Sequence, residues 1–388
     1  MMFSQTKNRF GLYMDLLRSS NYFKLVCGAG NEDKNEVEYL TYIYTLAGCS
    51  GFDVSASPEI VISAKKGINA ALSKARELKI DIPFVPFITV SVGMPGDHHV
   101  RKAIITSDCV NCNLCIPTCP TDAIPSNLKI LPDLCIGCGN CEAVCPPAAN
   151  AIKYVHNSKK LSSVLPQCVE AGAESIELHA GVPDHESTMD EWKIVSESVP
   201  NGMISMCLDR KHLSNDMLID RIKLASSIAD ERLIIQADGI PMSGGINDFN
   251  TTLQAVSIAD FINKEIKKKI KRFKNLPVLI SGGTNSYTGT LARKYGVNFN
   301  GITIGTHARK VIHKYESKPI DMSNESLKIA SKSWITDFYS CQKVDHSNFA
   351  REKLIDIFVN QNIYVDKDFK YREKNPTSFS NKIDLLKE

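Results

Sequence analysis

The sequence lacks two features that would direct the protein to a membrane or to nucleic acid. Its longest apolar stretch, Ile82 to Met94, is interrupted by two prolines and is far shorter than the roughly 20 residues that cross a bilayer. The 46 basic and 43 acidic residues nearly cancel and leave a formal net charge of +3. We therefore expect no membrane span and no nucleic-acid partner.

The amino-terminal region also lacks the pattern of a secretory signal. No continuous apolar segment with a small-residue cleavage site precedes Lys24, so we expect a cytoplasmic protein. The composition, 43% hydrophobic and 23% charged residues, is typical of a globular protein. Only the region after about Ile363 turns strongly polar and charged, and there we expect a tail that is partly flexible.

Eight short runs of apolar or β-branched residues alternate with longer stretches that are suited to helices. This alternation indicates repeated βα units, and eight such units favour a closed (β/α)8 barrel of the TIM-barrel type. The predicted strands are Lys24–Ala29, Gly51–Ala56, Pro83–Val92, Ser175–Ala180, Met203–Leu208, Arg232–Ala237, Pro277–Ser281 and Gly301–Gly305.

A cysteine-rich segment lies between the third and fourth predicted strands. We expect the barrel to comprise residues 1–100 and 156–312, with residues 101–155 as an inserted ferredoxin-like domain and residues 313–388 as a carboxy-terminal extension. An insertion after a strand emerges at the carboxyl ends of the barrel strands, which is the face where barrels carry their sites.

Two helices are predicted in more detail. Ser214 is a suitable N-cap for a helix that runs to Ala229. A second apolar stripe with helical spacing predicts one helix whose lysine-rich face is a solvated exterior, although an anion-binding patch is the alternative. The stripe consists of Leu253, Val256, Ile262, Ile266, Ile270 and Phe273.

Eight of the 13 cysteines form two groups with identical spacing, C-x2-C-x2-C-x3-C-P. This is the pattern of a bacterial ferredoxin with two [4Fe–4S] clusters, in which the fourth cysteine of each motif binds the other cluster. The pattern assigns one cluster to Cys109, Cys112, Cys115 and Cys145, and the other to Cys135, Cys138, Cys141 and Cys119.

Other metal chemistry fits these cysteines less well. Paired C-x2-C elements also suit structural zinc, but two complete copies of the ferredoxin spacing favour iron–sulfur clusters. Radical S-adenosylmethionine chemistry needs C-x3-C-x2-C, which the sequence does not contain. The second motif is two residues longer than the first between its last cysteine, Cys145, and the following Ala151-Ile152.

Glycine-rich turns follow the last two predicted strands. Gly282 and Gly283 follow the seventh strand, whereas Gly305 and Thr306 end the eighth. Barrels commonly hold phosphate at these two loops, and this part resembles flavin-mononucleotide-binding barrels such as dihydroorotate dehydrogenase. Bound FMN is therefore possible, and tight turns without a ligand are the alternative.

Polar residues stand at the ends of other predicted strands, namely Ser57, His179, Asp209 and Asp238. They could line a pocket at the top of the barrel, but residues of these types are also common in turns and helix caps. Predicted strands four to six contain no lysine that could face a flavin ring. No nucleophile and base are brought together by the sequence, so we predict no catalytic residue.

The whole chain resembles the LdpA (light-dependent period) family of cyanobacteria. The resemblance is carried by the inserted clusters together with the segments Val26–Gly30, Asp53–Pro58, Glu177–His179 and Gln236–Gly244. It implies an iron–sulfur redox sensor that relays the light-dependent redox state of the cell to the circadian clock and modulates its period. The implied partners are clock proteins, the circadian input kinase and an electron donor.

Three functions are compatible with these patterns. A redox sensor is favoured, because the clusters are fully ligated and no catalytic set is evident. A flavin-dependent oxidoreductase, supplied with electrons by the two clusters, is the alternative that the glycine-rich turns support. A purely structural cluster domain is the third, since metal binding contributes directly to folding.

Overall fold

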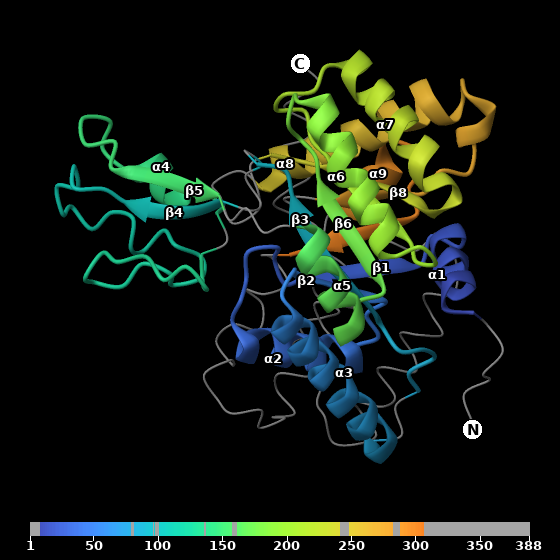
Figure 1. Ribbon diagram of the computed structural model, residues 1–388, viewed down its shortest axis with the longest axis horizontal. Coiled ribbons are helices and arrows are strands. Elements are labelled where there is room, and N and C mark those ends of the chain that lie inside the picture. The colour runs from blue at the N-terminus through green and yellow to red at the C-terminus, as the bar shows by residue number, and fades with distance from the viewer. Residues whose placement is uncertain are drawn as a thin grey trace.

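The computed structural model describes residues 8–78, 81–95, 97, 101–135, 137–156, 161–240, 248–281 and 288–305 of the protein. It shows a large α/β unit with a smaller unit at its side (Figure 1). Among these residues no helix is both long enough and apolar enough to traverse a lipid bilayer.

The larger unit is a closed barrel of eight parallel strands. Neighbouring strands are hydrogen bonded in the order β1, β10, β9, β8, β7, β6, β3 and β2, and the pairing of β2 with β1 closes the barrel. The predicted eight-stranded barrel is thus confirmed, with strand ends shifted by a few residues. The strands are β1 (Tyr22–Val26), β2 (Gly51–Ser55), β3 (Phe87–Gly93), β6 (Ser175–His179), β7 (Ile204–Leu208), β8 (Leu233–Asp238), β9 (Val278–Ser281) and β10 (Gly301–Ile304).

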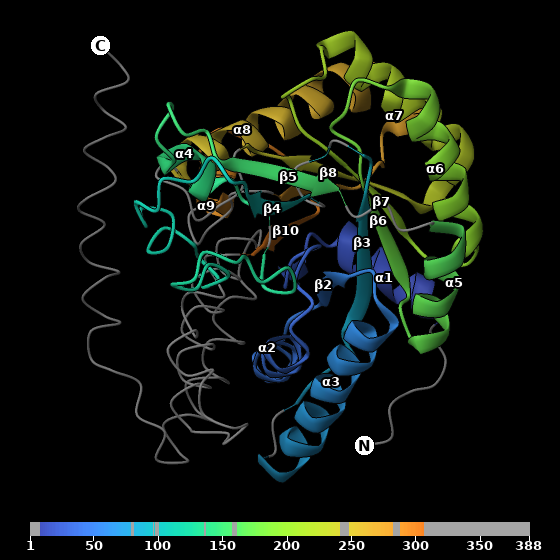
Figure 2. The same ribbon diagram turned by 60° about the vertical axis from the view of Figure 1, so that its left-hand side comes forward.

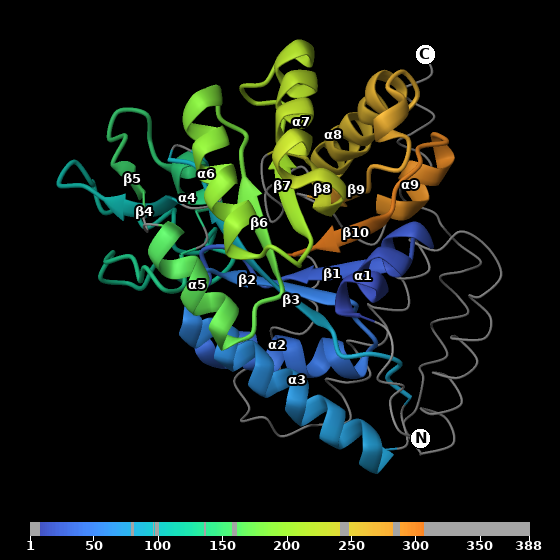
Figure 3. The same ribbon diagram turned by 45° about the vertical axis from the view of Figure 1, so that its right-hand side comes forward.

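Helices surround this barrel (Figure 3). Their first turns are fixed by side chains that accept backbone N–H groups, such as Asp33 before α2, Asp184 before α6 and Ser214 before α7. The predicted helix from Ser214 to Ala229 is confirmed as α7. The barrel helices are α2 (Lys34–Leu46), α3 (Pro58–Leu78), α5 (Leu161–Ala171), α6 (His185–Ser198), α7 (Asn215–Ala229), α8 (Asp248–Phe261) and α9 (Thr288–Lys294).

The segment that carries the apolar stripe from Leu253 to Phe273 is less regular than the single helix that its spacing predicts. Helix α8 ends at Phe261 and continues as a π-helix over Ile262–Lys267, and a 3-10 turn follows at Lys271–Phe273. Ile262 and Ile266 are buried within the π-helix. The lysines between the apolar positions lie mostly exposed, as expected for a solvated exterior.

Helix α1 (Arg9–Arg18) packs at the amino-terminal end of the barrel strands (Figure 3). Its buried residues Tyr13, Met14 and Leu17 share an apolar cluster with residues that begin or precede barrel strands. Those residues are Tyr22, Phe87, Met203, Ile234 and Leu279. The helix therefore closes the end opposite to the carboxyl ends of the strands.

The smaller unit emerges between β3 and α5 and projects to one side of the barrel (Figure 1), so that β4 and β5 lie in front of the barrel strands when this side is turned forward (Figure 2). Its two strands, β4 (Arg101–Ile105) and β5 (Ile152–His156), pair antiparallel, and the short helix α4 (Asn140–Val144) lies between them in sequence. Its small apolar core contains three of the cysteines of the two motifs, Cys115, Cys135 and Cys141. The predicted architecture, a barrel with an inserted ferredoxin-like unit, is confirmed.

Candidate functional site

Cys109, Cys112, Cys115 and Cys145 line one small cavity of about 20 Å³ in the smaller unit. Apolar residues such as Ile105 and Leu128 complete its wall. Burial raises the pKa of Cys115, and the thiols of Cys109, Cys112 and Cys145 raise it further. Four convergent cysteine sulfurs are the donor set that a [4Fe–4S] cluster requires, so these residues fit such a cluster.

The remaining four cysteines lie together in a second group. Burial raises the pKa of Cys141 to about 12, with further contributions from the thiols of Cys138, Cys135 and Cys119. Cys119 comes from the first motif, yet it interacts electrostatically with residues of the second. This group also has the donor set of a [4Fe–4S] cluster, and iron binding would displace the thiol protons.

Backbone N–H groups point at several of the sulfurs. The amide of Ala123 donates to Cys119 Sγ at 3.2 Å, and the amide of Ala151 donates to Cys145 Sγ at 3.4 Å. These are equivalent bonds in the two motifs, although the second motif is two residues longer. A turn after Pro146, ending at Asn150 with a φ of 43°, accommodates the additional residues.

The two groups of cysteines differ in their surroundings. Near the second group, Arg101 donates to the carbonyl of Gly137 at 3.1 Å and Lys102 donates to the carbonyl of Cys135 at 2.8 Å. Near the first group, Cys112 is exposed and the side chain of Val110 is 62% exposed. The first group thus has one cysteine that is exposed to solvent, whereas the second group is next to two cations.

Lys102 also joins the smaller unit to the barrel. Its side chain is only 8% exposed, and its ammonium donates to the carbonyl of Gly30 in the loop after β1. The same ammonium donates to the carbonyl of Pro132 at 2.6 Å. A second link is the bond from the Glu32 amide to the carbonyl of Asp133, at 3.0 Å. The second group of cysteines therefore lies directly beside this contact with the barrel.

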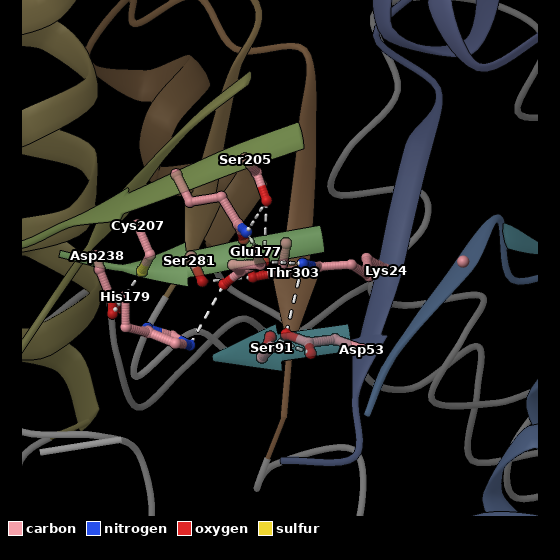
Figure 4. Close-up of polar contacts among 12 residues, drawn as sticks. Lys24, Asp53, Ser91, Glu177, His179, Ser205, Cys207, Asp238, Ser281 and Thr303 are labelled. Atoms are coloured by element: carbon pink, nitrogen blue, oxygen red, sulfur yellow. Dashed lines mark hydrogen bonds and ion pairs between the residues drawn. The ribbon is translucent and has the colours of Figure 1, made fainter. Parts of the chain in front are cut away.

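Inside the barrel, polar side chains from several strands meet around Lys24 (Figure 4). Its ammonium donates to Glu177 Oε2 and lies 3.5 Å from Asp53 Oδ2, and all three side chains are at most 2% exposed. Burial alone would lower the pKa of Lys24, but the carboxylates of Glu177 and Asp53 hold it above its ordinary value. Burial raises the pKa of Glu177 to about 7, against the lowering effect of Lys24.

Three of the four strand-end residues predicted from sequence are buried, namely His179, Asp209 and Asp238, whereas Ser57 is half-buried. The structure brings His179 and Asp238 to the rim of the Lys24 cluster (Figure 4). Sequence reasoning missed Lys24, Glu177 and Cys207, which complete this cluster. For Lys24 the available signal was a charged residue in the middle of the otherwise apolar strand β1, whereas Cys207 gave no such signal.

Of the residues predicted for a phosphate-like site, only Gly305 is among those that the structure describes. Gly282, Gly283 and Thr306 lie outside the described residues. Nothing in the described part of the chain supports a bound flavin.

The fold and the cysteine groups define an iron–sulfur protein in which a TIM barrel carries an inserted ferredoxin-type unit. The model of the 4Fe-4S binding domain matches residues 102–124 and 128–149, and the model of the Light dependent period A C-terminal domain matches residues 168–339. The chain belongs to the Light dependent period A family. Its relative of that name from Synechococcus elongatus is 30% identical over 279 residues, which cover 71% of this chain and 74% of the relative.

More limited similarities accompany this match. A ferredoxin from Alicyclobacillus acidocaldarius is 50% identical over 54 residues, which are 13% of this chain and 67% of that ferredoxin. A truncated 3-deoxy-D-arabino-heptulosonate 7-phosphate synthase from Thermotoga maritima aligns with a TM-score of 0.42 and 11% identity, covering 83% of this chain and 89% of that structure.

Proposed function

We propose that the protein is a redox sensor in which the inserted unit receives an electron and the barrel presents the response to a partner. In this proposal Cys109, Cys112, Cys115 and Cys145 bind one [4Fe–4S] cluster, and Cys135, Cys138, Cys141 and Cys119 bind the other. When bound, such clusters supply one-electron oxidation and reduction at potentials that the surrounding charges and hydrogen bonds adjust. The remaining steps depend on the protein's own residues.

The position of Lys102 is the observation that carries this proposal. One ammonium is hydrogen bonded both to the backbone of Cys135 and to Gly30 in the barrel loop. An added negative charge beside Cys135 would increase the electrostatic attraction between the cluster and the ammonium of Lys102, because charge interactions are strong where water is excluded. Lys102 would then move relative to Gly30 and alter the β1–α2 loop.

The different surroundings of the two cysteine groups indicate where an electron would enter and where it would reside. Arg101 and Lys102 lie beside the second group and favour the reduced, more negative state there. The exposed Cys112 and its neighbour Val110 make the first group the accessible place for an electron donor to dock. We infer that electrons enter at the first group and reside at the second, next to the barrel.

The family membership supplies the biological setting of this proposal. We propose that the chain acts in the cytoplasm, that it reports the light-dependent redox state to the circadian clock, and that clock proteins and the circadian input kinase are its partners. In this division of the chain, residues 101–155 form the sensing domain. Residues 1–100 and 156–312 form the responding barrel, and residues 313–388 form an extension.

A redox-controlled binding experiment tests the sensor. Anaerobically purified full-length protein should contain about eight irons and eight sulfides per chain and no stoichiometric flavin. Its affinity for the circadian input kinase is then measured with the clusters oxidised and reduced. We expect the affinity to change with redox state in the wild type, and Lys102→Met to abolish that change while retaining the iron.

The matched control is Lys153→Met, since Lys153 is an exposed lysine of the same two-stranded sheet. This variant should keep the redox-dependent affinity. Full iron content with the same affinity in both redox states would leave the clusters a structural role and refute the sensor. A stoichiometric flavin together with turnover of an added electron acceptor would instead establish the oxidoreductase.

A further inference from the structure

We propose that the barrel interior holds a mononuclear zinc site formed by Glu177, His179 and Cys207, separate from the iron–sulfur unit. These three residues come from two neighbouring strands and are at most 6% exposed. Their ligand atoms all lie within 4.8 Å of one another. The site lies toward the carboxyl ends of the strands, where barrels place their functional groups.

The sheet geometry explains why the three ligands converge. Glu177 and His179 are two residues apart on β6, so both face the barrel interior. His179 is paired with Cys207 on the adjacent strand β7, which places the imidazole beside the sulfur. The ligand set is therefore fixed by strand register and does not depend on a loop.

The distance between two of the ligands suits a small tetrahedral ion. Zinc bonds of about 2.0–2.3 Å separate two ligands of a tetrahedron by roughly 3.3–3.7 Å. His179 Nε2 lies 3.5 Å from Glu177 Oε1, which matches one edge of such a tetrahedron. Asp238 Oδ2 lies 3.1 Å from Cys207 Sγ and is close enough to become a fourth ligand after a small shift (Figure 4).

The two carboxylate oxygens of Glu177 have different partners. Oε2 accepts hydrogen bonds from Lys24, from Ser205 at 3.3 Å and from Gln236. Oε1 is the oxygen that faces His179. The bonds to Oε2 thus orient the carboxylate and leave Oε1 directed at the proposed ion, as outer hydrogen bonds do in known metal sites.

The charge of the interior also favours a cation. Two buried carboxylates, those of Asp53 and Glu177, contact the ammonium of Lys24, and a third, that of Asp238, lies beside Cys207. A divalent ion would offset the excess of negative charge in a region from which water is largely excluded. The proton on Cys207 Sγ, which now hydrogen bonds to Asp238, would leave to solvent when the metal binds.

The chemistry of the ligands selects the metal. A thiol, an imidazole and a carboxylate together are typical of zinc, whereas magnesium and calcium prefer sites made of oxygen alone. The iron–sulfur clusters differ from this site because they require four cysteines each. Zinc in the barrel can therefore be distinguished from zinc that has replaced iron in the insert.

The test uses full-length protein with its clusters intact, dialysed anaerobically against zinc ions and then against buffer. We expect one zinc per chain to be retained in addition to the full iron content. His179→Gln and Cys207→Ser should each lower zinc affinity at least about tenfold. Cys168→Ser is the matched control, since Cys168 is an equally buried cysteine on helix α5, and it should retain the zinc.

X-ray absorption at the zinc edge provides a measurement that does not depend on the variants folding. The wild type should show one sulfur at about 2.3 Å and nitrogen or oxygen ligands at about 2.0–2.2 Å. Four sulfurs around zinc would assign it to a cysteine motif and overturn the proposal. Absence of retained zinc, or equal retention by well-folded His179→Gln and Cys207→Ser, would overturn it as well.

Discussion

Buried charged side chains determine the local structure at several points of the barrel. Arg221 on α7 is fully buried, and its guanidinium donates to the carbonyls of Ala180 and Val182 at 2.6 Å each. It also donates to the carbonyl of Asp184 at 3.1 Å. One arginine thus satisfies the backbone of the loop that links β6 to α6, next to the strand that carries Glu177 and His179.

Arg221→Met should destabilise the barrel by about 3 kcal/mol, because it leaves several buried carbonyl groups without a donor. The shift in the urea unfolding midpoint, followed by tryptophan fluorescence, measures this loss. Lys223→Met on the same helix is the control, since Lys223 is exposed and its pairing with Asp220 is a surface interaction. That variant should change stability by less than about 0.5 kcal/mol, and equal effects of both variants would refute the role of Arg221.

The two groups into which the structure gathers the motif cysteines could be predicted from sequence, because the ferredoxin spacing is specific. The barrel cluster could not. Lys24 on β1 and Glu177 on β6 are 153 positions apart, and only closure of the barrel brings them into contact. Cys207 resembles any small buried residue until the register of β6 and β7 places it beside His179.

Helix α1 is an element whose contribution the strand pattern does not reveal. Its residue Leu17 is fully buried against the amino-terminal end of the barrel, and the hydroxyl of Tyr13 lies 2.6 Å from that of Tyr22. Because the helix covers apolar residues that begin five different strands or adjoin them, it joins strands that are distant in sequence.

Leu17→Ala should cost about 2–5 kcal/mol of stability, since it opens a cavity where the helix meets the barrel. Thermal unfolding of the full-length protein measures the effect. Arg18→Ala, at the neighbouring exposed position, should leave the midpoint nearly unchanged. If Leu17→Ala unfolds at the wild-type temperature, helix α1 is not an integral part of the barrel.

Elements with strong periodicity were predicted correctly, and the exceptions have physical causes. The eight barrel strands are short apolar runs between clear turn residues, so their positions could be read from the sequence. The stripe from Leu253 to Phe273 has helical spacing but not the regularity of one α-helix. Ile262 and Ile266 are buried in a π-helix, and the spacing of apolar residues alone does not distinguish a π-helix from an α-helix.

The two units of the molecule have different sources of stability. The barrel has an extensive apolar core, whereas the insert has a small one, of which three of seven buried members are cysteines of the two motifs. Its large apolar residues Val110 and Leu114 are more than half exposed. We therefore expect the insert, but not the barrel, to depend on bound clusters for folding.

Removal of iron should accordingly unfold one unit only. After oxidative loss of the clusters in the presence of a chelator, we expect fast amide hydrogen exchange throughout residues 101–156. Exchange in β6, β7 and β8 should stay as slow as in the intact protein. Mass spectrometry resolves both regions in one experiment, and continued protection of β4 and β5 without iron would contradict the dependence.

The antiparallel pairing of β4 with β5 has a consequence for the history of the chain. Arg101 is paired with His156, so the insert leaves the barrel and returns to it at almost the same point. A unit whose ends adjoin can be acquired by an existing barrel with little disturbance of its neighbouring strands, because the gap it opens is short. The structure thus has the form expected when a ferredoxin-like module is inserted into a surface loop of a barrel.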